Sequence, residues 1–136
     1  MKEYVLDANA LVRLYRDTPG AEIVDGLIRH AKAGRAHLAI SVVNLAETLY
    51  ILSRYFGKEQ AMRCIEGTRG AVEAIPVDEQ QALETAMLRF YYKLGLADCF
   101  AASLAMRAGA TLVTADPEFV KLGKQLKVLN LPRHSA

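Results

Sequence analysis

Four acidic residues interrupt otherwise apolar stretches of this sequence. Asp7 follows Tyr-Val-Leu, Glu47 follows Val-Val-Asn-Leu-Ala, Asp98 follows Leu-Gly-Leu-Ala, and Asp116 follows Leu-Val-Thr-Ala. A carboxylate removed from water without a partner is costly, so it usually takes up a proton or binds a cation. Carboxylate oxygens are also the ligands that hard divalent cations prefer. The pattern therefore predicts a metal site built from these four acids.

Three of the four acids also have a structural explanation that needs no metal. Asp116 precedes Pro117, which is the arrangement of a helix N-cap followed by proline at the first helical position. Asp7 could open the turn into the next helix, and Asp98 could cap a helix that begins with Cys-Phe-Ala-Ala. Glu47 lies mid-helix among apolar residues, so its alternative to a metal is a Lys or Arg partner elsewhere in the chain.

The elements that would position these acids alternate between short strands and helices. From the apolar periodicity we expect strands at residues 3–6, 38–40, 72–77, 111–114 and 128–129. Helices are expected at residues 10–16, 21–31, 42–55, 58–68, 79–94 and 97–108. Such alternation predicts an α/β fold, a three-layer sandwich in which a mostly parallel central sheet is flanked by helices.

Particular residues predict where helices begin and end. Ser41 and Asp78 are expected to be N-caps, because their side-chain oxygens can accept from the first free backbone N–H groups. Gly34, Gly95 and Gly109 are expected to end the helices that precede them.

The expected topology suggests how the acids could meet. In a parallel α/β sheet, functional sites gather at the carboxyl ends of the strands. Asp7 directly follows the first expected strand, and Asp116 lies just after the strand at 111–114. If those two strands are neighbours, the two acids lie at one edge of the sheet. Glu47 and Asp98 belong to helices that follow other strands, so all four could converge.

Length and composition restrict the class of protein. With 136 residues, 52% of them hydrophobic, we expect a single domain over residues 1–136 with a substantial core. No stretch resembles a signal-peptide core or a membrane span, so a cytoplasmic protein without membrane contact is expected. Cys64 and Cys99 would then be reduced and buried. The net charge of +2 would rise by four if a metal neutralised the four acids, which would favour a polyanionic partner.

These motifs together resemble the PIN-domain family, in particular the small single-domain VapC-type toxins of prokaryotic toxin–antitoxin pairs. The resemblance covers residues 4–119 and rests on four features in order. They are an early strand ending in Asp7, Glu47 in an apolar helix, Leu-Ala-Asp-Cys-Phe-Ala-Ala around Asp98, and Leu-Val-Thr-Ala-Asp-Pro-Glu-Phe around Asp116. Ala8 and Pro117 depart from the usual pattern without touching the four acids.

The resemblance implies a Mg²⁺- or Mn²⁺-dependent endoribonuclease that hydrolyses RNA phosphodiester bonds with a metal-activated water. Asp7, Glu47, Asp98 and Asp116 would be its catalytic, metal-binding residues. Asn9 and Thr114 would support the first and last acids with an amide and a hydroxyl. The resemblance further implies an RNA substrate, a cognate antitoxin protein and a homodimer.

Two other classes of function remain open from the residues. A Mg²⁺-dependent phosphotransfer or phosphatase-type domain also uses an Asp at a strand end, but Asn9 stands where its second acid would be needed. The other alternative is a catalytically inactive PIN-like RNA-binding module, against which the complete set of acids argues. His30, His37 and His134 have no ligand spacing and are expected at the surface.

Overall fold

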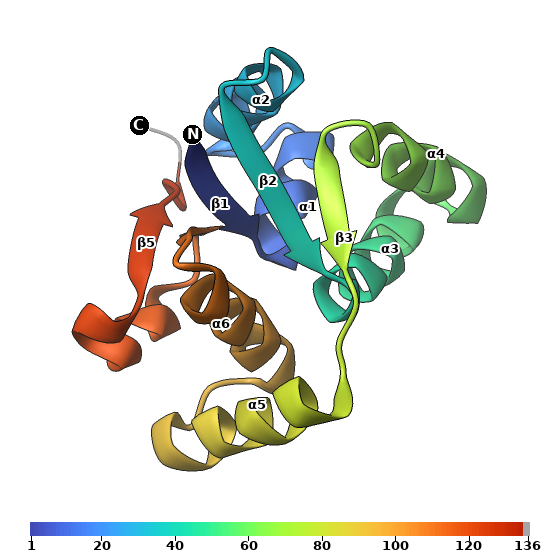
Figure 1. The fold of residues 1–136 in the computed structure, drawn as a ribbon. Helices are drawn as coiled ribbons and strands as arrows, with labels where there is room; N and C mark the ends of the chain where they lie inside the picture. The colour runs from blue at the N-terminus through green and yellow to red at the C-terminus, as the bar shows by residue number, and fades with distance from the viewer. Residues whose placement is uncertain (135–136) are drawn as a thin grey trace.

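The central feature of the computed structural model, which describes residues 1–134, is a parallel sheet between two layers of helices (Figure 1). Its strands are β1 (Lys2–Leu6), β2 (Ala36–Ser41), β3 (Val72–Ile75), β4 (Thr111–Thr114) and β5 (Lys127–Asn130). They are ordered β3-β2-β1-β4-β5, and every neighbouring pair is parallel. The expected α/β three-layer sandwich is confirmed, with the sheet entirely rather than mostly parallel in these residues.

Helices connect the strands and cover both faces of the sheet. They are α1 (Ala8–Arg16), α2 (Ala21–Lys32), α3 (Val42–Phe56), α4 (Lys58–Thr68), α5 (Glu79–Tyr92) and α6 (Leu96–Ala108), with the 3-10 segment η1 (Pro117–Gln125) before β5. Residues of α1 and α2 pack in one apolar cluster, whereas residues of α6 and η1 pack in the other. None of the helices in the described residues is long and apolar enough to cross a membrane.

The core lies on both sides of the central strands. Val5 and Leu6 are adjacent in β1 and fully buried, yet Val5 packs with α6 and Leu6 packs with α1 and α2. This division follows from the alternation of side chains along a strand. A strand buried on both faces therefore shows a continuous apolar run, which is why the sequence around Asp7 is apolar on its N-terminal side.

Most of the expected element boundaries are confirmed within two residues. Ser41 accepts from the Val43 N–H at 3.3 Å and caps α3, and Asp78 accepts from the Gln81 N–H at 2.8 Å and caps α5. Gly109 ends α6 with φ of 63°.

The prediction that Gly95 ends α5 was wrong. Lys93 ends that helix in a left-handed conformation with φ of 57°, and its N–H donates to the Arg89 carbonyl at 2.9 Å. Gly95 instead occupies the N-cap position of α6. The start of the 3-10 segment η1 agrees with the cap suggested by Asp116 and Pro117, but the extent of η1 was not predicted, and its chain path breaks at Gly123, with φ of 54°.

The position of β1 between β2 and β4 brings together the chain segments that follow β1 and β4. Leu6 at the end of β1 lies in register with Val113 of β4. The Asp7 N–H then donates to the Val113 carbonyl at 3.4 Å, just beyond the ladder. The chain leaving β1 and the chain leaving β4 are thus held side by side.

Candidate active site

Asp7 is the most constrained acid of the four. It follows β1 directly, is only 2% exposed, and caps α1 by accepting from the Ala10 N–H at 2.9 Å, as predicted. Its second carboxylate oxygen accepts a short hydrogen bond from the Thr114 hydroxyl. Both oxygens are therefore held in place by the end of β4 and the first turn of α1.

Thr114 and Asn9 connect the two chain segments that carry Asp7 and Asp116. The Asp116 N–H donates to the Thr114 hydroxyl oxygen at 3.0 Å, so Thr114 links both acids. The Asn9 amide oxygen accepts from the Ala115 N–H at 3.2 Å and from Arg13 Nε at 3.0 Å. The two polar residues singled out in the sequence therefore fix the geometry at the carboxyl ends of β1 and β4.

Asp116 lies at the start of η1 and confirms the cap predicted from its proline. Its carboxylate accepts from the Glu118 N–H at 2.9 Å, and Pro117 occupies the first position of the segment. This cap uses one carboxylate oxygen. The Asp116 side chain also hydrogen-bonds with Asp98, so the carboxylate that caps η1 faces a second acid of the set.

Asp98 does not cap a helix, contrary to one of the structural explanations. The helix begins at Leu96, two residues before Asp98, so the carboxylate lies in the first turn and Gly95 takes the N-cap position. Asn44 of α3 donates from Nδ2 to the Ala97 carbonyl at 3.0 Å and ties α3 to this turn. The side chain of Asp98 is thereby left free to face Asp116.

Glu47 comes from the middle of α3 and is half-buried. Within residues 1–134 it forms no salt bridge, so the alternative of a Lys or Arg partner finds no support there. Thr48, the next residue, is fully buried and donates to the Asn44 carbonyl at 2.7 Å. The orientation of α3 that buries Thr48 brings Glu47 to the rim of a cavity.

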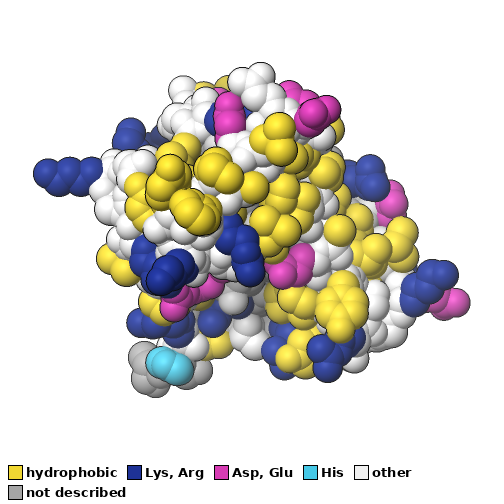
Figure 2. Space-filling view, turned by 90° about the horizontal axis from the view of Figure 1, so that it is seen from below, with side chains coloured by type: hydrophobic (Ala, Val, Ile, Leu, Met, Phe, Trp, Pro, Cys, Tyr) yellow, Lys and Arg dark blue, Asp and Glu magenta, His cyan; other side chains and the backbone are white. Residues whose placement is uncertain are grey.

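The four acids converge in that cavity, which has a volume of about 520 Å³. It lies where the carboxyl ends of β1 and β4 meet the first turn of α6 and the middle of α3. Its lining residues are Asp7, Ala8, Asn9, Val12, Arg13, Glu47, Ile51, Asp98, Ala115, Asp116, Pro117, Arg133 and His134. The view from below in Figure 2 shows acidic side chains beside Lys, Arg and exposed hydrophobic side chains.

Burial and mutual repulsion raise the proton affinity of this cluster. Burial raises the pKa of Asp7 to about 6 against the hydrogen bonds from Thr114 and Ala10, and Asp116 and Glu47 add repulsion. Burial and the Asp116 charge raise the pKa of Asp98 to about 7, assisted by a hydrogen bond with Asp116. Burial also raises the pKa of Glu47. Gathering these carboxylates is unfavourable unless protons or a cation compensate the charge.

The four carboxylates supply the oxygen ligands that a hard divalent cation prefers, although they are spread around the cavity. Oxygen ligands from carboxylates, with waters completing the shell, are what Mg²⁺ and Mn²⁺ accept. In residues 1–134 no three acidic, histidine or cysteine side chains lie close enough together to hold a metal ion by themselves. An ion held by these acids would keep part of its water shell.

Three basic residues of this cavity escaped the sequence analysis. Arg13 lies four residues after Asn9 on α1 and therefore on the same helix face, a signal that was available in the spacing. Arg133 and His134 reach the cavity because Arg13 donates to the Pro132 carbonyl at 3.0 Å. His134 was expected only at the surface, and it is exposed but lies at the rim of the site.

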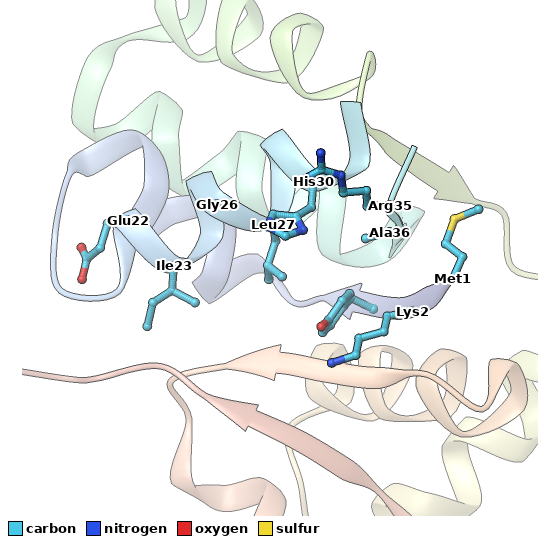
Figure 3. Close-up of a pocket in the computed structure, with 10 residues that line it drawn as sticks. Met1, Lys2, Glu22, Ile23, Gly26, Leu27, His30, Arg35 and Ala36 are labelled. Carbon is cyan, nitrogen blue, oxygen red and sulfur yellow. The ribbon is translucent and has the colours of Figure 1, made fainter. Parts of the chain in front are cut away.

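A larger cavity of about 700 Å³ lies at the opposite ends of the strands (Figure 3). It is formed by the first residues of β1 and β2 against α2, with Lys2, His30 and Arg35 among its lining. Glu22 is its single acidic lining residue. Because metal chemistry needs several carboxylates together, the smaller cavity is the candidate active site.

The comparisons with known proteins agree with this geometry. The PIN domain family matches residues 4–125, which is nearly the whole chain and includes all four acids. The chain belongs to the PIN domain family. The resemblance noted from the sequence motifs is thus confirmed at the level of the family. No curated protein matched the chain in a sequence comparison.

Solved structures of VapC proteins share the fold of this PIN domain. One is in the VapBC2 complex of Rickettsia felis bound to a promoter DNA fragment, with TM-score 0.74, 26% identity, and coverage of 96% of this chain and 99% of that one. VapBC-1 of nontypeable Haemophilus influenzae gives TM-score 0.71 at 23% identity, covering 94% and 97%. VapC20 of Mycobacterium tuberculosis, a Sarcin-Ricin loop cleaving toxin, gives TM-score 0.72 at 13% identity, covering 88% and 95%.

Proposed function

We propose that this PIN domain protein is a Mg²⁺- or Mn²⁺-dependent endoribonuclease and the toxin of a type II toxin–antitoxin pair. The observation that carries the proposal is the convergence of four carboxylates, from β1, α3, α6 and the end of β4, in one cavity. The fold shared with VapC proteins supports it, since VapC20 is a toxin that cleaves the Sarcin-Ricin loop.

In this proposal the four acids are the metal ligands and catalytic residues. Asp7 and Asp98 would be the central ligands, with Asp116 completing the set and Glu47 binding directly or through water. A bound divalent cation supplies a water activated near neutral pH and stabilises the departing oxygen. Thr114 and Asn9 would act as positioning residues, because they hold Asp7, Asp116 and the start of α1 in one arrangement.

The basic rim would bind the phosphates that flank the scissile bond. Arg13 lines the cavity from α1, and Arg133 and His134 line it from the C-terminal segment after β5. A guanidinium can contact two phosphate oxygens at once, which fixes the strand in front of the acids. The raised pKa values of Asp7 and Asp98 imply that cation binding releases protons from the cluster.

The test is RNA cleavage by the purified protein with Mn²⁺, with Mg²⁺ and with EDTA. Water attack on phosphorus leaves a 5′-phosphate and a 3′-hydroxyl, so end-group analysis reads the mechanism. Asp98→Asn should abolish cleavage, whereas Asp17→Asn, at an exposed helix end, should leave it unchanged. A 2′,3′-cyclic phosphate formed in the presence of EDTA would refute metal-activated water.

A cognate antitoxin protein is the partner that the proposal requires. The VapBC2 and VapBC-1 structures are toxin–antitoxin complexes, which supports an antitoxin for this chain as well. Induced expression in bacteria without the antitoxin should arrest growth, and Asp7→Asn or Asp98→Asn should relieve the arrest at equal protein levels. Arrest by both variants as strong as by the parent would mean that the toxicity does not come from this site.

A homodimer through α5 is the second assembly that we propose. Leu83, Met87 and Phe90 are 63%, 52% and 71% exposed and lie along one side of α5, four and then three residues apart. A stripe of apolar side chains that a single chain leaves exposed indicates a surface that a partner covers. A second copy can cover it with the same stripe around a two-fold axis.

The alternative functions have less support. A phosphotransfer mechanism would need a second acid near Asp7, but Asn9 stands there and its amide is used by Ala115 and Arg13. Incubation with acetyl phosphate should therefore leave the protein unphosphorylated. A catalytically inactive RNA-binding module would have no need of the burial and charge repulsion that raise the pKa of Asp98.

A further inference from the structure

A stripe of half-buried and exposed side chains on α3 begins at Glu47 and leads away from the acidic cavity. Tyr50, Ile51, Arg54 and Tyr55 follow Glu47 by three, four, seven and eight residues, so all five lie on one face of the helix. At a rise of 1.5 Å per residue the stripe is about 12 Å long. We refer to these residues, with Arg16 of α1, as the α3 stripe.

Each tyrosine of the α3 stripe is paired with an arginine. The guanidinium of Arg16 lies over the Tyr55 ring at 3.7 Å from its centroid, and that of Arg54 lies 5.8 Å from the Tyr50 centroid. Tyr50 is 61% exposed and Tyr55 is 55% exposed. Large rings are thus displayed to solvent with cationic groups held beside them.

The α3 stripe is continuous with the candidate active site. Ile51 lines the acidic cavity and also lines a second hollow of about 220 Å³ together with Arg54 and Tyr55. Helices α1 and α3, which supply the stripe, lie against each other in Figure 1. A chain leaving the acidic cavity past Ile51 therefore meets Tyr55 and its arginine next.

The arginines of the α3 stripe are available to a ligand. In residues 1–134 neither Arg16 nor Arg54 forms a salt bridge with an acidic side chain. The other members of the stripe are two aromatic rings, the aliphatic Ile51 and, at the cavity end, Glu47. An apolar protein surface would be poorly matched by two free cations, whereas a strand of alternating bases and phosphates needs both kinds of group.

We propose that the α3 stripe binds the single-stranded segment of the RNA substrate that leaves the active site. Bases stack on Tyr50 and Tyr55, and the guanidiniums of Arg16 and Arg54 stack on the same bases or contact the phosphates between them. The inference rests on the proposed ribonuclease function and adds the path of the substrate. Helix α3 would then have two roles. Glu47 lines the acidic cavity, and the other residues on the same face bind the RNA strand.

The first experiment measures binding of a fluorescein-labelled single-stranded RNA to the Asp98→Asn protein by anisotropy. Adding Tyr50→Ala or Tyr55→Ala should weaken binding about tenfold each, because one stacked base is lost. The Tyr→Phe variants keep the ring and should bind as the parent does. Tyr91→Ala, which removes an exposed tyrosine ring from α5, is the matched control and should have no effect.

The second experiment measures the contribution of the charges. Arg54→Gln should lower the slope of log affinity against log salt concentration by about 0.7, as expected for one phosphate contact on a single strand. Arg107→Gln is the matched control, because Arg107 is exposed in the last turn of α6, at the far end from Asp98. Its salt slope should equal that of the parent.

Equal RNA affinity of the parent and both Tyr→Ala variants would overturn the proposal. So would a loss of antitoxin binding in these variants with RNA affinity intact, because the α3 stripe would then be a protein interface. Failure of the ribonuclease function has a different signature, since the wild-type protein with Mn²⁺ would leave RNA uncut. If only the substrate path is wrong, cleavage persists and Tyr50→Ala has an unchanged KM.

Discussion

Replacement of Asp7 by Asn should stabilise the metal-free protein near neutral pH. The carboxylate is 2% exposed, and its pKa is raised from 3.8 to about 6, mainly by burial. Because the folded state holds the proton more tightly than the unfolded state, stability falls as the pH rises from about 4 to about 6. Asn has nearly the same shape and stays neutral, so the variant avoids this loss.

The size of the stability change follows from the shift in the pKa of Asp7. At about 1.4 kcal/mol per pKa unit, a rise from 3.8 to about 6 corresponds to roughly 3 kcal/mol of lost stability above pH 6. Asn keeps the cap on the Ala10 N–H but weakens the bond from Thr114, which costs about 1 kcal/mol. We therefore expect a net gain of about 2 kcal/mol at pH 7.5 and no gain at pH 4.

Urea denaturation followed by circular dichroism, in EDTA and at several pH values from 4 to 8, measures this difference. Asp17→Asn is the matched control, because Asp17 is exposed and lies outside the acidic cavity. Millimolar Mn²⁺ should stabilise the wild type and should stabilise Asp7→Asn less. A variant that is less stable than the wild type at pH 7.5, or a gain of equal size at pH 4 and pH 7.5, would refute the electrostatic reasoning.

Three further results are expected. Thr114→Val, which removes the hydroxyl that joins Asp7 and Asp116, should lower kcat at least tenfold with a smaller change in KM. Thr111→Val, at the other end of β4, should leave kcat unchanged, and equal kcat values for the two variants would contradict the positioning role of Thr114. Met87→Glu on α5 should convert a dimer into a monomer in sedimentation, and an unchanged mass would exclude this face. The midpoint pH for Mn²⁺ binding, measured by competition with a fluorescent chelator, should lie between about 6 and 7. An affinity for Mn²⁺ that does not change with pH would contradict the raised pKa values of Asp7 and Asp98.

Local sequence signals were enough for most of the elements and for selecting four acids that line one cavity. Buried strands show as short apolar runs, and an acid directly after such a run is conspicuous because its burial is costly. Caps at Ser41, Asp78 and Asp116 were predictable for the same reason, since a cap depends on residues only two or three positions away. The helix end at Lys93 was missed because a left-handed Lys leaves no mark in composition.

The sequence alone thus determined the strand and helix order, the family and the set of acids. Only the tertiary structure decided that β1 lies beside β4, that the first turn of α6 reaches Asp116, and that Arg133 and His134 line the same cavity. It also decided that the tyrosines of α3 meet Arg16, a residue of another helix. These facts depend on contacts between segments far apart in the chain, whose pairing is fixed by packing of the whole core rather than by any local pattern.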